Sequence, residues 1–181
     1  SISSDEVSPL CKILPLISNA SISKVANILN SSARPLLILG RGANQAGVSD
    51  KLSLFVKRTK IPFVVSQMAK GVLDERLSEY IGTTALSSGD YVHKAIERAD
   101  VVIVVGHDTT EKPPAILPFG NQKVIHIHSC RAEKDRIYTP SVQVVGDIAY
   151  ALHELAEKVS PKCPWDFSFF NKVRDSFKKS N

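Results

Sequence analysis

The chain has 181 residues, of which 43% are hydrophobic and 23% charged, which is the length and composition of one soluble globular domain. Every apolar run is shorter than the roughly 20 residues that span a bilayer, and the first residues lack the pattern of a signal peptide. We therefore expect a cytoplasmic protein with no membrane partner. Most of the net charge of +5 comes from the end of the chain, because residues 158–181 include six Lys or Arg and only two Asp. Such a tail usually forms a solvated face, so no nucleic-acid partner is expected.

The three cysteines, Cys11, Cys130 and Cys163, are far apart and form no CxxC pair. This spacing predicts reduced thiols rather than a disulfide framework or a zinc site.

The hydrophobic pattern predicts strands that alternate with helices. In chain order, we expect a helix over about 21–31 capped by Ser21, a strand over 35–39, a helix around Leu52 to Val56, a strand over 62–65, a long loop over 67–89, a helix over 91–98 in which His93 faces Glu97, strands over 100–106, 123–129 and 142–146, and a helix that begins at Asp147. Strands that are apolar on both faces need helices on both sides. The pattern therefore predicts an α/β fold with a doubly wound parallel sheet.

The tail after 160 is rich in aromatic residues outside this alternation. Trp165, Phe167, Phe170, Val173 and Phe177 follow at roughly helical spacing. An apolar helix needs a surface to cover it. The tail is therefore either a capping helix on its own domain or the start of a connection to a further domain.

The ends of the predicted strands are the candidate ligand site, because open α/β sheets bind ligands beyond the carboxyl ends of their strands. This rule selects 40–43, 66–68, 106–109, 129–131 and 146–148. Glycine follows three of the strands directly, which permits either close approach of a ligand or only a tight turn. The stretch "GRGANQAG" has Gln45 where a dinucleotide fingerprint needs its third glycine, and Ser66 ends the second strand where an acidic residue is needed. An NAD site is therefore disfavoured.

Catalytic and metal-binding patterns are weak in this sequence. His126 and His128 share one side of a strand, which suits either a metal pair or packing, and we predict no metal. His107, Asp108 and Glu111 at a strand end suit either acid–base chemistry or a capped turn. Asp147 is explained by capping of its helix. Because no nucleophile or base accompanies these groups, we predict no catalytic residue in the chain and rank an independent small enzyme last.

Several ordered motifs carry a resemblance to a known family. They are "ARPLLILGRGA" (33–43), "RTKIPFVVSQMAKGVLDE" (58–75), "YIGTTAL" (80–86), "AIERADVVIVVG" (95–106), and "KVIHIHSCRAEKD" to "VVGDIAYAL" (123–152). This set resembles the central domain of thiamine-diphosphate-dependent enzymes, above all acetolactate synthase large subunits. The resemblance implies a sheet of about six strands with helices on both faces.

The resemblance also implies flanking domains that bind the pyrimidine and the diphosphate of thiamine diphosphate. The chain is then a fragment with a connecting segment over 1–19, the central α/β domain over 20–159 and a linker or helix over 160–181. The full-length enzyme, a homo-oligomer of branched-chain amino-acid biosynthesis, would use thiamine diphosphate and Mg²⁺ to decarboxylate a 2-keto acid and join the product to a second one. This fragment alone would bind neither of these cofactors.

In acetolactate synthases, the central domain forms a cradle for FAD. Carried over to this chain, the resemblance implies cofactor-binding residues Gly40, Arg41, Gly42, Ser66, Gln67, Gly82, Thr83, Gly106, His107, Gly146, Asp147 and Ile148. The family's "GMHG" is "GTTA" at 82–85 here, its "GARFDDR" has Asp108 and Lys112 at the arginine positions, and His128 replaces an acidic residue. The alternatives are the central domain of a non-flavin decarboxylase and a self-standing module for ADP or FAD. If the chain is a self-standing module, its tail should pack on its own domain. If the chain is a fragment, its tail should be mobile or packed on a neighbouring chain.

Overall fold

The computed structural model describes residues 14–84, 91–107, 111, 122–132, 139–160 and 165–179. In chain order its elements are α1 (Asn19–Asn30), β1 (Pro35–Leu39), the 3-10 helix η1 (Arg41–Asn44), α2 (Val48–Thr59), β2 (Phe63–Val65), the 3-10 helix η2 (Gln67–Ala69), β3 (Tyr80–Thr83), α3 (Tyr91–Arg98), β4 (Val101–Val105), β5 (Lys123–His128), β6 (Val142–Val145), α4 (Ile148–Lys158) and α5 (Ser168–Lys179). Within these residues, no helix is long and apolar enough to cross a membrane.

The six strands form one parallel sheet in the order β3-β2-β1-β4-β5-β6. β1 and β4 pair in register from Pro35 with Val101 to Leu39 with Val105, and the strand order reverses between them. The predicted doubly wound α/β fold is therefore confirmed. Its switch point lies at the carboxyl ends of β1 and β4, where such sheets bind ligands.

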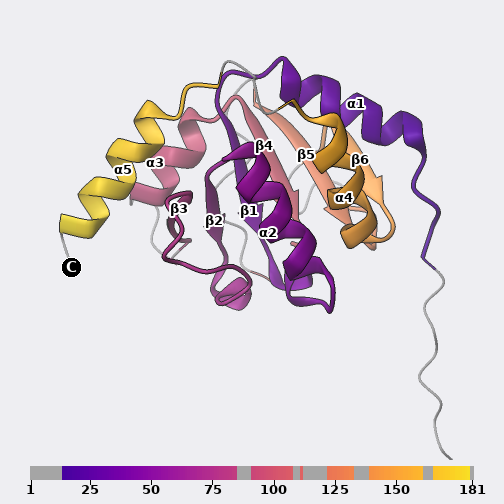
Figure 1. Ribbon diagram of the computed structural model, residues 1–181, viewed down its shortest axis with the longest axis horizontal. Helices are drawn as coiled ribbons and strands as arrows, with labels where there is room; N and C mark the ends of the chain where they lie inside the picture. Colours follow the sequence, from indigo (N-terminus) through magenta and orange to yellow (C-terminus); the bar gives the residue numbers. More distant parts are fainter. Residues whose placement is uncertain are drawn as a thin grey trace, which may run out of the picture.

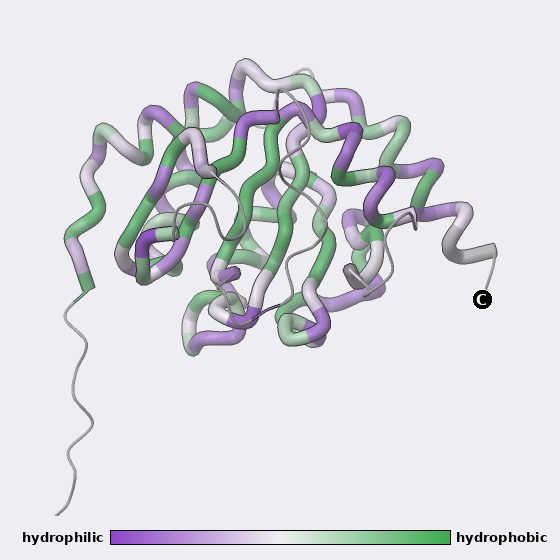
Figure 2. The backbone as a smooth tube through the Cα atoms, turned by 180° about the vertical axis from the view of Figure 1, so that it is seen from behind, coloured by the Kyte–Doolittle hydropathy of each residue, from purple (hydrophilic) through white to green (hydrophobic). Residues whose placement is uncertain are grey.

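Helices cover both faces of the sheet because alternate strand residues are apolar on both sides. Leu37, Leu39 and Ile103 belong to one core, which the sheet shares with α1, α2 and α4, whereas Leu36 and Ile38 belong to a second core with α3 and α5. The three layers are visible in Figure 1, with α2 and α4 in front of the sheet. From the opposite side, Figure 2 shows the strands as a hydrophobic layer in the middle of the domain.

β3 corrects the long loop that the sequence pattern predicts over 67–89. Tyr80–Thr83 lies at the edge of the sheet, and the Phe63 amide donates to the Glu79 carbonyl oxygen at 2.8 Å. The strand is only four residues long and contains Gly82, so the hydrophobic pattern is too short to reveal it.

The structure makes one smaller correction to the predicted helices, at the start of α1. This helix begins at Asn19, and its cap is Ser18 rather than Ser21, because the Ser18 hydroxyl oxygen accepts the Ser21 amide at 3.1 Å. In α3, His93 is 5% exposed and lies with Val92 among the buried residues of the helix, whereas its approach to Glu97 stays a prediction.

The aromatic tail forms α5, which packs on its own domain. Phe170 is fully buried, Val173 is 7% exposed, and both lie in the core shared with α3. Two hydrogen bonds hold the residues before α5. The Trp165 indole donates to the Leu29 carbonyl oxygen in the last turn of α1 at 3.0 Å, and the Asp166 amide donates to the Ala33 carbonyl oxygen in the loop before β1 at 2.8 Å. The capping-helix reading is therefore confirmed for the described tail, and the Phe177 side chain lies outside the described residues.

A carboxylate fixes the start of β1 against the start of β4. Asp100 accepts the amides of Ala33 and Arg34 through its two oxygens, at 2.6 and 2.8 Å. A carboxylate that accepts two consecutive amides forms charge-assisted bonds, which are stronger than neutral ones. Asp100 thereby sets the register at which the two central strands begin.

Phe170→Ala should lower the free energy of unfolding by about 3–5 kcal/mol, because the substitution empties a fully buried site between α5, α3 and the sheet. Phe169→Ala is the matched control, since Phe169 is half-buried and stacks under the Arg98 guanidinium, and it should cost only about 1–2 kcal/mol. Urea unfolding measures both values. Equal losses would show that α5 is not part of the cooperative core.

Asp100→Asn should lower the free energy of unfolding by about 2 kcal/mol, because the amide side chain accepts with one oxygen and lacks the charge. Glu97→Gln makes the same chemical change on the exposed side of α3 and should leave the stability within about 0.5 kcal/mol. Thermal unfolding at neutral pH distinguishes the two variants. A loss at Glu97 as large as that at Asp100 would contradict the two-amide contact.

Candidate functional site

The carboxyl ends of the neighbouring strands β2, β1 and β4 bring together seven of the residues expected to bind a cofactor. Gly40, Arg41 and Gly42 follow β1, Ser66 and Gln67 follow β2, and Gly106 and His107 follow β4. Because β2, β1 and β4 are neighbours in the sheet, these residues meet at the switch point. We call residues 40–43, 66–67, 106–107 and Glu111 the switch-point corner.

The loops after β1 and β4 cross in direct backbone contact. The Gly42 amide donates to the Gly106 carbonyl oxygen at 2.7 Å. A Cβ atom added to Gly42 would lie 2.8 Å from that oxygen, and one added to Gly106 would lie 2.4 Å from the Ala43 nitrogen. Gly106 also has a φ of 66°, which favours glycine. Contact between the two loops therefore accounts for both glycines.

The backbone amides of the β1 loop are engaged within the protein. The Gly40 amide donates to the Val105 carbonyl oxygen at 2.8 Å, and the Ala43 amide donates to the Gly40 carbonyl oxygen at 2.9 Å. Between them, the Arg41 amide donates to Oε1 of Glu111 at 2.8 Å. Together with the Gly42 bond, these contacts engage all four consecutive amides from Gly40 to Ala43.

Glu111 is a buried carboxylate in the middle of this corner. It is 3% exposed, accepts the Arg41 amide through Oε1 and accepts the Ser66 hydroxyl through Oε2. Ser66 itself is 4% exposed. The sequence places Glu111 near the end of β4 but offers no signal that its carboxylate reaches the ends of β1 and β2. Asp108, its expected partner in acid–base chemistry, lies outside the described residues.

The FAD cradle that the resemblance implies does not fit these residues at its diphosphate end. A diphosphate bound at Gly40–Gly42 would need backbone N–H donors, and the amides there already donate to protein oxygens. A carboxylate rather than a cation also faces the Arg41 amide, so the local charge opposes a second anion.

The remaining expected residues lie toward the two edges of the sheet. Gly82 and Thr83 belong to β3 itself, and a Cβ on Gly82 would lie 2.9 Å from the Val92 side chain. Gly146 lies under the first described segment, where a Cβ would come within 2.5 Å of the Pro15 carbonyl oxygen. Asp147 caps α4, as predicted, by accepting the Tyr150 amide at 3.1 Å, and Ile148 is buried in the core. These residues are not brought to the switch-point corner.

The histidine pair on β5 is packed and hydrogen-bonded. The rings of His126 and His128 stack with centroids 5.6 Å apart. Nε2 of His126 donates to the Cys130 carbonyl oxygen at 2.9 Å, and Nδ1 of His128 accepts the Cys130 amide at 3.0 Å. Cys130 is a free, exposed thiol, whereas Cys11 and Cys163 lie outside the described residues. Among the described residues, no group of three or more His, Cys, Asp or Glu could hold a metal ion.

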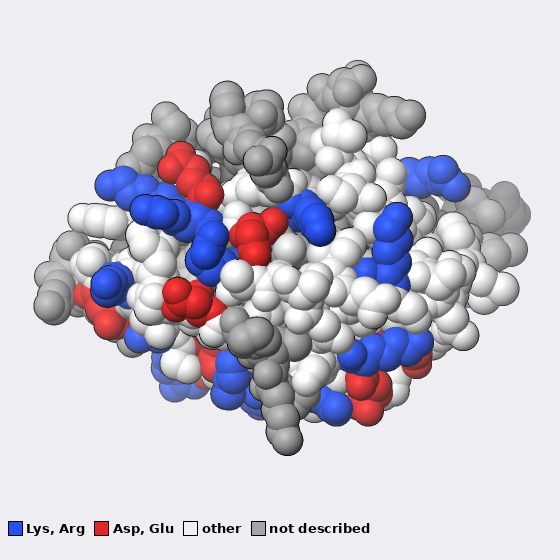
Figure 3. Space-filling view, turned by 90° about the horizontal axis from the view of Figure 1, so that it is seen from above, with Lys and Arg blue, Asp and Glu red and all other residues white. Residues whose placement is uncertain are grey.

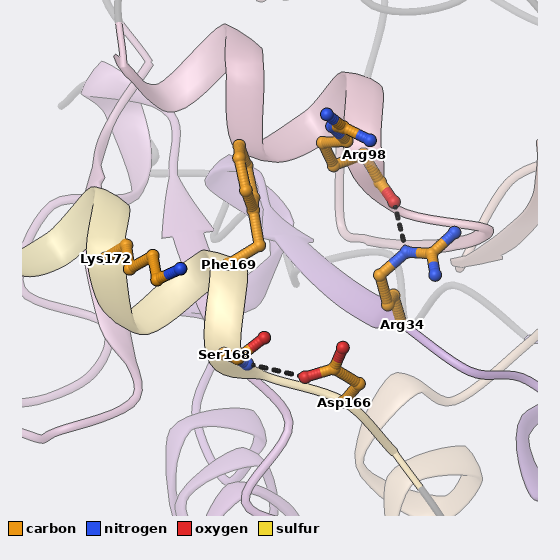
Figure 4. Close-up of a pocket in the computed structure, with 6 residues that line it drawn as sticks. All are labelled: Arg34, Arg98, Asp166, Ser168, Phe169 and Lys172. Carbon is orange, nitrogen blue, oxygen red and sulfur yellow. Dashed lines mark hydrogen bonds between the residues drawn. The ribbon is translucent and has the colours of Figure 1, made fainter.

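A hollow lies at the amino ends of the strands, at the opposite end of the sheet from the switch-point corner. It has a volume of about 270 Å³ and is lined by Arg34, Arg98, Asp166, Ser168, Phe169 and Lys172. Figure 4 shows the Arg34 side chain bonded to the Arg98 carbonyl oxygen, at 2.9 Å, and Asp166 bonded to the Ser168 amide, also at 2.9 Å. Figure 3 shows Lys and Arg beside Asp and Glu on one face of the molecule. Of the polar groups in the hollow, Asp166 thus bonds the start of α5 and Arg34 bonds the end of α3.

Protonation of His126 should destabilise the fold as the pH falls. Burial lowers the pKa of His126, and the nearby His128 and His107 lower it further, against the raising effect of the Cys130 carbonyl oxygen. Since the unfolded imidazole keeps a pKa near 6.5, the unfolded chain takes up the proton first, and stability is lost as the pH falls below that value. His126→Gln, which can still donate to Cys130, should flatten the dependence of the unfolding free energy on pH between about 7.5 and 5.5. His153→Gln, at an exposed position, is the control, and equal pH slopes in the two variants would refute the assignment.

Comparison with known proteins identifies the family to which most of the chain belongs. A family model described as the central domain of thiamine pyrophosphate enzymes matches residues 22–155. A protein of Mycobacterium smegmatis described as thiamin diphosphate-dependent has a solved structure that matches with a TM-score of 0.65 and 22% sequence identity, over 80% of this chain and 28% of that one. The similarity to this structure supports the six-stranded α/β fold.

Similar curated proteins include two kinds of enzyme. The 2-hydroxyacyl-CoA lyase 1 of Mus musculus is 28% identical over 94% of this chain and 30% of its own length. The catabolic acetolactate synthase of Raoultella terrigena is 26% identical over 78% of this chain and 25% of its own length. The acetolactate synthase of Bacillus subtilis is 25% identical over 80% of this chain and 25% of its own length. The chain thus spans between 25% and 30% of the length of these three relatives. By its fold and by a match that covers most of its length, the chain belongs to the family of thiamine pyrophosphate enzyme central domains.

Proposed function

We propose that this chain is the non-catalytic, structural central domain of an acetolactate-synthase-like enzyme. The observation that carries the proposal is the family match over residues 22–155 on a six-stranded sheet of the same fold. The complete enzyme would bind thiamine diphosphate and Mg²⁺ between its flanking domains, decarboxylate a 2-keto acid and transfer the remaining fragment to a second keto acid. The cofactor supplies the electron sink for that chemistry, and the protein positions it.

The positions of the first and last helices support a domain set between two others. α1 packs beside β6, at one edge of the sheet, whereas α5 packs on β3, at the other edge. Figure 1 shows these two helices at opposite ends of the molecule. Connections at 1–19 and 160–181 would therefore join the flanking domains at opposite edges of the central domain over 20–159.

α5 packs on its own domain, which is the arrangement that a self-standing module predicts. The family match over residues 22–155 supports the central domain and ends before α5, so the role of α5 in a larger enzyme is part of our proposal. The proposal thus assigns α5 two roles, as a cap over Phe170 and as the connection toward the diphosphate-binding domain.

A related lyase is the second candidate for the complete enzyme. The support for it is the 2-hydroxyacyl-CoA lyase 1 of Mus musculus, which matches 94% of this chain. Such an enzyme would cleave a carbon–carbon bond next to a hydroxyl group rather than form one. The two candidates share the central domain and differ in the substrate and in whether a carbon–carbon bond is formed or cleaved.

The test is an activity assay of the complete enzyme, purified with this chain between its two flanking domains. With thiamine diphosphate, Mg²⁺ and pyruvate, it should release carbon dioxide and form acetolactate, whereas the 181-residue chain alone should do neither. Cleavage of a 2-hydroxyacyl-CoA without acetolactate formation would favour the lyase. Carboligation by the isolated chain would overturn the assignment of a non-catalytic domain.

A further inference from the structure

We propose that Glu111 is a built-in anion that fills the switch-point corner, so that this domain binds neither FAD nor ADP through a diphosphate at Gly40–Gly42. The inference rests on contacts within the chain and does not depend on which reaction the complete enzyme catalyses.

The hydrogen-bond donors of the corner support this assignment. A phosphate at the end of β1 would be held by the Arg41 amide and the Ser66 hydroxyl, because these donors meet there between two strand ends. Both already donate to the Glu111 carboxylate, one to each oxygen. The neighbouring amides of Gly40 and Gly42 donate to the carbonyl oxygens of Val105 and Gly106. A diphosphate would therefore have to displace either Glu111 or the pairing at the ends of the two central strands.

The space in the corner leads to the same conclusion. A Cβ atom on Gly40 would lie 2.6 Å from Oε1 of Glu111 and 2.4 Å from the His107 Cα atom. A corner that has no room for one methyl group cannot admit a phosphate beside Glu111. The 3% exposure of Glu111 also keeps its charge away from solvent, so a second anion placed there would be repelled without screening by water.

The carboxylate also has a structural role. Glu111 joins its own segment to Arg41, which is 70 residues earlier, and to Ser66, which is 45 residues earlier. One side chain thereby links the segment after β4 to the ends of β1 and β2. Loss of the carboxylate would leave a part-buried amide and a buried hydroxyl without this acceptor, which is costly.

Chemical rescue tests the built-in anion directly. Glu111→Ala should lower the melting temperature by roughly 4–10 °C, and acetate should restore part of that loss, beyond the effect of chloride at equal ionic strength, because acetate can occupy the vacated carboxylate position. Glu157→Ala is the control, since Glu157 is an exposed carboxylate paired with Arg58 at 2.9 Å, and its removal leaves no enclosed position for an anion. Its melting temperature should respond equally to the two salts. A Glu111→Ala variant that gains no more from acetate than from chloride would overturn the proposal.

A second measurement needs no variant, so it decides the question even where Glu111→Ala fails to fold. The unaltered chain, labelled with ¹⁵N, is titrated with FAD, with ADP and with inorganic diphosphate, and the amide resonances of Arg41 and Gly42 are followed. We expect both resonances to stay in place at every concentration. Saturable movement of both by any of the three ligands would show that the corner accepts a diphosphate, and would refute the role assigned to Glu111.

Discussion

The structure depends on one close approach of backbone to backbone, between Gly42 after β1 and Gly106 after β4. The two central strands end side by side, and the Gly42 amide bonds the Gly106 carbonyl oxygen at 2.7 Å. No side chain fits at either position. Because the strand order reverses at this pair, the contact closes the crevice in which doubly wound sheets otherwise hold ligands. The Glu111 carboxylate, bonded to Arg41 and Ser66, completes the closure.

The clearest successes of the sequence analysis are local. The strand Pro35–Leu39 and the helix Tyr91–Arg98 follow from short-range apolar periodicity, and Asp147 is recognisable as a cap because it precedes an apolar helical stripe. β3 escapes this reasoning because an edge strand of four residues with an internal glycine has too little pattern. Its existence is implied only by the resemblance to a six-stranded family.

The candidate site is harder to predict, because its contacts join residues far apart in the chain. Gly40, Gly42 and Gly106 are correctly expected at strand ends, and the alternatives of ligand approach and tight turn were both consistent with the sequence. The structure adds a third reason for glycine, the crossing of two loops. The position of Glu111 depends on partners 70 and 45 residues away, which no local pattern encodes.

The arrangement of the helices bears on the place of this domain in the larger enzyme that we propose. Its sheet is buried by α1, α2 and α4 on one face and by α3 and α5 on the other. The first and last helices lie at opposite edges, on β6 and β3. In the function that we propose, such a domain, closed at its switch point, would hold two flanking domains apart without taking part in their chemistry. In our account, the corner therefore contributes rigidity rather than a ligand site.

Amide hydrogen exchange of the unliganded chain tests this account most directly. If the corner is closed by its own contacts, the amides of Gly40, Arg41 and Gly42 exchange as slowly as those in the middle of β1, without added nucleotide. Fast exchange of these three amides in the free chain, with protection appearing only when FAD or ADP is added, would contradict the account and restore the corner as a nucleotide site.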